Sequence, residues 1–348
     1  MARRIQGGEE SDWETVGINL LDLVMSGAGR MVAPVAGYPG VKLVGRSIRE
    51  ALYDAETQLE ALRALDARLR PDIVFTLLDL TVEAEAMGLG VDFHERRPPG
   101  LQNQRLPKLE RFYELGPPDP EKSGRMPVFL RVAEDLPGID GRLRGAFITG
   151  PFTLLAQLLG AEELLDRVRL GDTLVEPLGF ATEVVGGYAA ALAQRVDLVT
   201  IVDPASVALE APQYDALYRP FVSGLAAIIR SSGAISVLHI CGDSAHLLEI
   251  LSMAGVEGIA LDAKVDLARE AARVPLSLVL MGNIDPGRVL RRGTVEDVRW
   301  EVRRLLRHTG GMRNLILSTG CDVSYDTPVA NLEAMVEEAR AWRRRTVP

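Results

Sequence analysis

The chain contains eight short apolar stretches, rich in Val, Ile and Leu, which are separated by longer segments of helical character. None of the eight shows the alternation of polar and apolar residues that is typical of a strand with one face in water. Short, continuously apolar runs indicate strands that are covered on both faces, as in a parallel sheet. The predicted strands are 31–37, 72–79, 145–150, 197–203, 234–242, 258–262, 276–282 and 314–319.

The segments between these strands have the features of helices. The leucines of residues 55–69 recur at helical spacing, and Ser11 with Glu14 offers a capping box for a helix that would end near Ser26. A loop is predicted at residues 37–40. Further helices are predicted at 128–134, 153–159, 161–195, 211–231, 245–254, 267–273, 295–309 and 329–345.

Strands that alternate with helices indicate an α/β fold with a parallel sheet. Eight strands favour a closed (β/α)8 TIM barrel over the alternative, a doubly wound open sheet, because no Gly-x-Gly-x-x-Gly motif follows the first strand. We therefore predict one TIM-barrel domain over residues 1–348, with an N-terminal helical extension. Residues 88–127, which Pro and Gly interrupt, are the least regular part, and we expect them to cover one rim of the barrel.

Composition narrows the class of protein. The 348 residues are 47% hydrophobic and 25% charged, as in an ordinary soluble enzyme, and the net charge of −9 argues against nucleic acid and anionic membranes as partners. No apolar run reaches membrane-spanning length, and the N-terminus lacks the apolar core of a signal peptide. Two cysteines do not make a disulfide framework. These features predict a cytoplasmic protein.

Several predicted strands end in polar side chains. In a (β/α)8 barrel the C-terminal ends of the strands surround one active-site mouth, and a charged side chain there is costly unless a ligand, metal or partner uses it. The substrate-binding candidates at these positions are Asp79, Asp203, Asp262 and Asn283. Asp203, like Asp285 after the seventh strand, is explained equally well as a helix N-cap at its turn.

Three other residues at strand ends are suited to bind a metal. His239 and Cys241 share one side of the fifth predicted strand because side chains alternate along a strand, and Cys321 follows the eighth. Two thiolates and one imidazole suit zinc, and three protein ligands with one open position are the form of a catalytic zinc site. The alternative is that each is an ordinary core residue, since a free Cys is usually a small buried hydrophobe.

Several segments match the motifs of one family. They are residues 71–79 followed by Glu85-Ala86-Met87-Gly88, then Gly150-Pro151-Phe152-Thr153, residues 261–266 and Gly282-Asn283-Ile284-Asp285-Pro286. On these residues the sequence resembles the uroporphyrinogen decarboxylase superfamily over nearly its whole length. The resemblance implies a single barrel domain, in agreement with the strand count.

Within that superfamily the sequence is most similar to the corrinoid:thiol methyltransferases, the group that contains methylcobamide:coenzyme M methyltransferase. That group carries zinc ligands matched here by His239, Cys241 and Cys321, and residues 327–328 and 331–332 also resemble it. The resemblance implies a zinc-dependent methyltransferase, with these three as metal-binding and catalytic residues, that moves a methyl group from a methyl-corrinoid to a thiol such as coenzyme M. The chain has no evident corrinoid-binding domain, so a corrinoid protein carrying methyl-cobalamin is expected to act in trans.

Other functions remain open. A corrinoid-dependent methyltransferase with tetrahydrofolate as acceptor would need no zinc, and a non-catalytic barrel could bind a corrinoid or a corrinoid protein. A decarboxylase of the uroporphyrinogen type is less favoured, because residues 35–40 replace the Arg-rich substrate loop of those enzymes and Cys321 stands where they have His. Cobalamin-independent methionine synthase is a similar zinc barrel, and its acidic zinc ligand would correspond roughly to Asp262.

Overall fold

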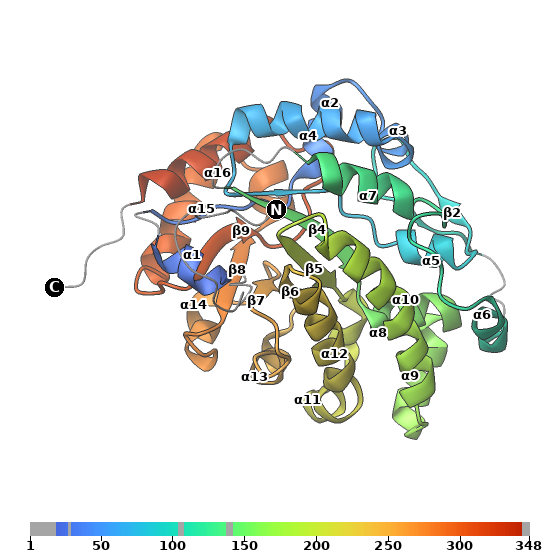
Figure 1. Cartoon of the computed structure of the whole chain (residues 1–348). Coiled ribbons are helices and arrows are strands. Elements are labelled where there is room, and N and C mark those ends of the chain that lie inside the picture. The colour runs from blue at the N-terminus through green and yellow to red at the C-terminus, as the bar shows by residue number, and fades with distance from the viewer. Residues whose placement is uncertain (1–18, 27–28, 104–107, 137–141, 343–348) are drawn as a thin grey trace, which may run out of the picture.

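The structure, a computed structural model, describes residues 19–26, 29–103, 108–136 and 142–342. These residues contain a seven-stranded parallel sheet with the strand order β1-β4-β5-β6-β7-β8-β9. Figure 1 shows the strands in the centre of the molecule and the helices around them. The strands are β1 (Ile73–Phe75), β4 (Leu143–Thr149), β5 (Leu198–Val202), β6 (Ile235–Ile240), β7 (Gly258–Leu261), β8 (Val279–Ile284) and β9 (Leu315–Thr319).

The first predicted strand, 31–37, is present only as a short bridging segment. Ala33 N–H donates to the Leu317 carbonyl of β9 at 2.9 Å, and Asp72 N–H, just before β1, donates to the Val32 carbonyl at 2.9 Å. Residues 31–33 therefore join the two edges of the curled sheet and stand in the place of the eighth strand. The strand is shorter than predicted because Pro34 has no N–H to continue the ladder.

The predicted helices are largely confirmed. The predicted loop at residues 37–40 is wrong, because helix α2 begins at Gly37, and Pro39 is compatible with the first turn of a helix. Of the predicted helix 11–26, residues 20–26 are helical and 11–18 lie outside the described residues. The longer helices are α1 (Leu20–Ser26), α2 (Gly37–Leu43), α3 (Ile48–Tyr53), α4 (Ala55–Leu69), α6 (Leu109–Leu115), α7 (Met126–Asp135), α8 (Pro151–Leu159), α9 (Ala161–Leu170), α10 (Val175–Ala193), α12 (Arg219–Ser231), α15 (Val295–His308) and α16 (Val329–Ala341).

Shorter elements fill the connections. The irregular region 88–127 holds an antiparallel pair, β2 (Val91–Asp92) with β3 (Gly100–Leu101), besides α6. The short helices are α5 (Val82–Ala86), α11 (Ala211–Gln213), α13 (Leu248–Leu251), α14 (Leu267–Glu270), the 3-10 helices Pro204–Ala208, Ala245–Leu247 and Ala271–Arg273, and the π-helices Tyr214–Tyr218 and Pro286–Arg291.

Two layers of apolar side chains hold the barrel together. Alternate strand residues point inward, so Ile235 and Val237 of β6 belong to an inner cluster with Phe75, Phe147 and Met281. Leu238 and Ile240 point to the opposite side of β6 and belong to the outer cluster beneath the helices. The period of two that places Ile235 and Val237 inside also turns His239 and Cys241 toward the barrel interior.

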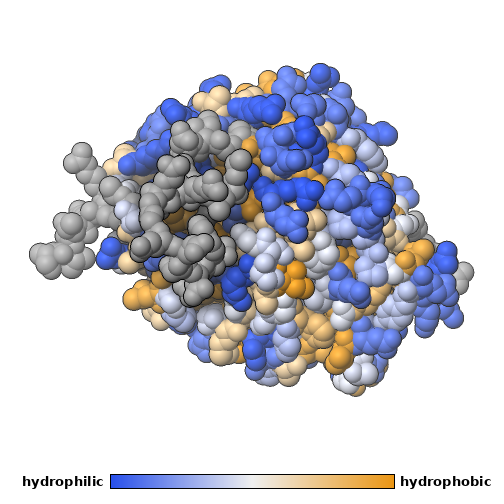
Figure 2. Space-filling model, viewed as in Figure 1, coloured by the Kyte–Doolittle hydropathy of each residue, from blue (hydrophilic) through white to orange (hydrophobic). Residues whose placement is uncertain are grey.

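The outer surface is largely hydrophilic on the face shown in Figure 2, where hydrophobic residues reach the surface only in separate patches. Within the described part of the chain, no helix combines the length and the apolar character that crossing a membrane requires.

Candidate functional site

The predicted His-Cys-Cys group comes together at the C-terminal ends of two strands. His239 is on β6 and Cys241 directly follows that strand. Cys321 follows β9, which is separated from β6 by the strands β7 and β8. His239 Nε2 lies 3.2 Å from Cys241 Sγ, and the two sulfur atoms are 3.6 Å apart. The three ligand atoms all lie within 4.8 Å of one another, so the structure groups residues that are 80 positions apart in the sequence.

The geometry of this group fits zinc. Ligands held tetrahedrally at about 2.0–2.3 Å from zinc are separated from one another by about 3.3–3.8 Å, close to the distances observed here. His239 Nδ1 lies 3.0 Å from the Ala260 carbonyl, which can only accept a hydrogen bond. Nδ1 therefore carries the proton in this contact, and Nε2 is left with a free lone pair on the side of the cysteines.

The three groups also perturb one another's ionisation. The hydrogen bond from Cys241, followed by the contact with His239, lowers the pKa of the Cys321 thiol to about 4, although burial acts in the opposite direction. The pKa of Cys241 is raised, because it donates that hydrogen bond to Cys321 and is itself buried. Burial alone would lower the pKa of His239, but its hydrogen bond with Cys321 raises it. These contacts favour the deprotonated form of Cys321 over that of Cys241.

Asp262 lies beside this group, and its carboxylate is engaged by the backbone. Its two oxygens accept hydrogen bonds from Gly242 N–H and Lys264 N–H, each at 2.9 Å. Asp262 is not among the clustered ligand atoms. It fastens the turn after Cys241 to the loop after β7. Asn283 supports the same loop, because its amide donates to the carbonyls of Asp262 and Val265 at 2.9 and 2.7 Å.

Asp203 is fully buried and does not cap its own turn. Asp285 does cap the helix that follows it, which was one of the two explanations that the sequence left open. The Asp203 carboxylate instead accepts hydrogen bonds from the Thr153 N–H of α8, at 2.9 Å, and from the Tyr218 hydroxyl. Burial raises the pKa of Asp203 despite these hydrogen bonds. A side chain on Gly150 would collide with this carboxylate, which explains the glycine before α8.

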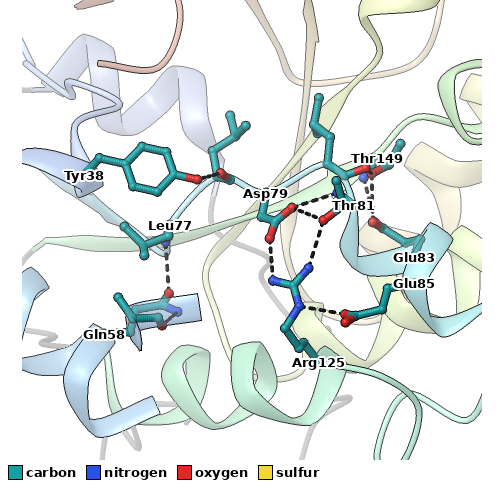
Figure 3. Close-up of polar contacts among 12 residues, drawn as sticks. Tyr38, Gln58, Leu77, Asp79, Thr81, Glu83, Glu85, Arg125 and Thr149 are labelled. Atoms are coloured by element: carbon teal, nitrogen blue, oxygen red, sulfur yellow. Dashed lines mark hydrogen bonds and ion pairs between the residues drawn. The ribbon is translucent and has the colours of Figure 1, made fainter. Parts of the chain in front are cut away.

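Asp79 belongs to a buried ion-pair network that the sequence analysis missed (Figure 3). Arg125, 3% exposed, donates from Nη1 to the fully buried Asp79 carboxylate at 2.5 Å and from Nε to Glu85 at 2.7 Å. Its remaining nitrogen donates to the Thr81 hydroxyl at 2.9 Å. All three nitrogens of the guanidinium therefore donate hydrogen bonds, and these bonds connect the start of helix α7 to the loop after β1.

Glu83 is a second functional candidate that the sequence did not reveal. It is fully buried on α5, and its two oxygens accept the N–H and hydroxyl of Thr149 at 2.7 and 2.8 Å (Figure 3). Burial raises the pKa of Glu83 from 4.5 to about 7, although these hydrogen bonds act to lower it. Only its place in a Glu-x-Glu pair near a strand end could have drawn attention to it.

The raised pKa of Glu83 makes stability depend on pH. The folded protein holds this proton more tightly than the unfolded chain, so the free energy of unfolding decreases as the pH rises from about 4.5 to about 7. We expect Glu83→Gln to remove this decrease, as measured by urea unfolding below, within and above that range. The exposed Glu60→Gln is the control. Parallel pH profiles for wild type and Glu83→Gln would contradict the prediction.

A narrow cavity of about 20 Å³ opens beside the His-Cys-Cys group inside the barrel. His239 and Cys321 line it together with Asp322, the residue after Cys321. Burial and the nearby Cys321 raise the pKa of Asp322 well above its ordinary value. The sequence analysis overlooked Asp322 because it lies three residues after the end of β9 and has no motif of its own.

The barrel and its strand ends define the class of protein. The chain matches the uroporphyrinogen decarboxylase family over residues 23–342 and belongs to that family, as the sequence resemblance predicted. A solved methyltransferase structure from Methanosarcina mazei shares the fold, with a TM-score of 0.82 and 23% identity over 92% of this chain and 97% of that one. This likeness confirms the predicted α/β barrel.

Among the relatives within the family are two methyltransferases of Methanosarcina mazei. The methylcobamide:CoM methyltransferase MtbA is 29% identical over 304 residues, which cover 84% of this chain and 87% of that protein. A methylated-thiol–coenzyme M methyltransferase is 30% identical over 281 residues, covering 78% and 72%. The predicted relationship to the corrinoid:thiol branch is therefore confirmed.

Proposed function

We propose that this protein is a zinc-dependent methyltransferase that moves a methyl group from a methylated corrinoid to a small thiol. The observation that carries the proposal is the grouping of His239, Cys241 and Cys321 at strand ends of a barrel whose relatives are named as methylcobamide:CoM and methylated-thiol–coenzyme M methyltransferases. Soft sulfur ligands with one imidazole suit zinc. The site therefore offers a thiol-activating centre.

The residues of the chain have separate parts in this proposal. His239, Cys241 and Cys321 would hold zinc, which when bound lowers the pKa of an acceptor thiol so that it reacts as the thiolate. The Ala260 carbonyl orients the His239 ring by accepting from Nδ1. We assign Asp262 and Asn283 to positioning, because their polar atoms fasten the loops on either side of the metal ligands.

We infer that a separate corrinoid protein presents methyl-cobalamin to the mouth of the barrel. The described residues form the barrel and its covering helices, and the inner cluster fills the barrel interior with side chains, which leaves the cofactor to approach from the strand ends. The assignment to the cytoplasm stays a prediction from the sequence.

Methyl transfer from methylcobalamin to small thiols tests the proposal. We expect His239→Ala to lower the rate by about 100-fold or more, because a ligand contributes at least as much as the groups that orient it. The rate is measured from the change in cobalamin absorbance as the methyl group is transferred. His308→Ala, an exposed histidine on α15, is the control and should keep the wild-type rate.

Removal of zinc with a chelator should abolish transfer, and added zinc should restore it. Transfer that persists after chelation would refute the role of zinc. Methyl transfer to tetrahydrofolate but to no thiol would favour the alternative acceptor, and loss of carbon dioxide from a porphyrinogen would favour the decarboxylase.

A further inference from the structure

Cys241 and Cys321 lie close enough to react with one another. Their sulfur atoms are 3.6 Å apart, and both cysteines are free. The sulfur–sulfur bond of a disulfide is about 2.05 Å long, so an approach of about 1.5 Å would bring the two atoms to bonding distance. The 348 residues contain two cysteines in all, so no other cysteine of the chain competes for either sulfur.

The turns that carry the two cysteines are packed to different degrees. Both cysteines lie beyond the last residue of a strand, so strand pairing does not fix them. Beside Cys241, a Cβ added to Gly242 would lie 3.7 Å from its nearest neighbour, in ordinary contact. Beside Cys321, a Cβ added to Gly320 would collide with Ala263. We therefore expect Cys241 to make most of the approach, while Cys321 stays in its tightly packed turn.

The pair is open to small reagents. Cys241 and Cys321 are both partly exposed, whereas the third member of the group, His239, is only 6% exposed. Hydrogen peroxide is little larger than a water molecule and can reach partly exposed side chains. Accessible sulfur atoms are the usual targets of such oxidants.

We propose that Cys241 and Cys321 form a reversible disulfide under oxidising conditions, and that this bond switches the metal site off. The inference goes beyond the methyl-transfer reaction and shares with it only the metal ligands. Zinc binds the thiolate form of cysteine, which a disulfide no longer offers. The bond would therefore remove two of the three ligands and leave His239 alone, and a thiol reductant would restore both.

The oxidation balances with a hydroperoxide as the oxidant. One cysteine sulfur attacks a peroxide oxygen, the oxygen–oxygen bond breaks, and hydrogen peroxide yields a sulfenic acid and one water. The second sulfur attacks the sulfenic sulfur, the sulfur–oxygen bond breaks, and a second water leaves. The two thiol protons end in these waters, and the two electrons lost by the sulfurs reduce the peroxide. Because the second sulfur is already adjacent, it captures the sulfenic acid before further oxidation.

Hydrogen peroxide added to the zinc-containing protein tests this switch. We expect release of about one zinc ion per chain, measured with a chromogenic chelator. Peptide mapping without reductant should show the peptides of Cys241 and Cys321 joined, and reductant followed by zinc should reverse both changes. Retention of zinc and free thiols would overturn the proposal. So would zinc release with the cysteines found as sulfinic acids or in links between two chains.

Variants test whether the proximity of the two sulfurs matters. Cys241→Ser and Cys321→Ser are compared with the wild type in metal-free form, with circular dichroism to establish folding. Each variant should keep a sulfenic acid that dimedone labels, at about ten times the level in the wild type, where the second sulfur removes it. Equal labelling would refute the pairing. Met253→Leu removes a methionine that is 54% exposed, and its zinc release should match that of the wild type.

This proposal and the methyl-transfer proposal can fail separately. If no thiol is methylated but the two cysteines form the reversible cross-link, the methyl-transfer function is wrong and the disulfide stands. If thiols are methylated but peroxide produces no cross-link, the function stands and the switch is wrong.

Discussion

Replacement of Cys321 by Ala is expected to leave the purified protein with almost no zinc, whereas the wild type should hold about one zinc ion per chain. The reason is the composition of the site, in which each of His239, Cys241 and Cys321 supplies one ligand atom and no fourth His, Cys, Asp or Glu of the described residues joins them. Two remaining ligands do not hold zinc firmly. Cys241→Ala should behave in the same way.

Metal analysis of the purified variants, with circular dichroism to establish folding, checks this result. His308→Ala serves as the control and should retain the metal. If the two cysteines were simply small core residues, removing either would leave the zinc content unchanged. Full zinc occupancy in the Cys241→Ala/Cys321→Ala double variant would therefore exclude the metal site.

Replacement of Arg125 by Ala is expected to destabilise the fold by about 3–5 kcal/mol, because it leaves the buried Asp79 carboxylate and the partly buried Glu85 carboxylate without their cationic partner. Arg125 and Asp79 are 3% and 0% exposed, and the guanidinium also lies 4.7 Å from the centre of the Phe93 ring. Both the ion pair and this cation–π contact disappear in the variant. Urea unfolding measures the loss.

Two further variants make this result specific. Adding Asp79→Asn to Arg125→Ala should recover part of the lost stability, since the uncompensated charge is then removed. Arg111→Ala breaks an exposed ion pair with Glu114 and should change the stability little. A loss in Arg125→Ala no larger than in Arg111→Ala would show that the buried network does not stabilise the fold.

The sequence predicted what depends on local periodicity. Apolar runs located the strands, and the period of two placed His239 and Cys241 on one side of β6. The grouping with Cys321 followed from the rule that strand ends of a barrel meet at one mouth. The strand predicted at residues 31–37 is the exception, because it is much shorter than its apolar pattern indicates. Pro34 has no N–H to continue the ladder and therefore ends the strand.

The partners of the buried acids could not be predicted in this way. Asp79 pairs with Arg125, 46 residues later, and Asp203 binds Thr153, 50 residues earlier. Such pairs depend on how helices lie over the sheet, and nothing in the neighbourhood of either aspartate reveals them. Asp203 for this reason caps α8 and not the turn that follows it, and Asp322 is recognised only from the shape of the cavity.

The narrow junction at residues 31–33 also has a consequence for biosynthesis. These residues are synthesised long before their partner Leu317, which belongs to β9. Cys321 follows the same strand, so the ring of strands and the proposed zinc site are both incomplete until β9 and Cys321 have been synthesised. A nascent or truncated chain that lacks β9 has neither a closed ring nor its third ligand. Metal loading would then report that the chain has been made at least as far as Cys321 and has folded.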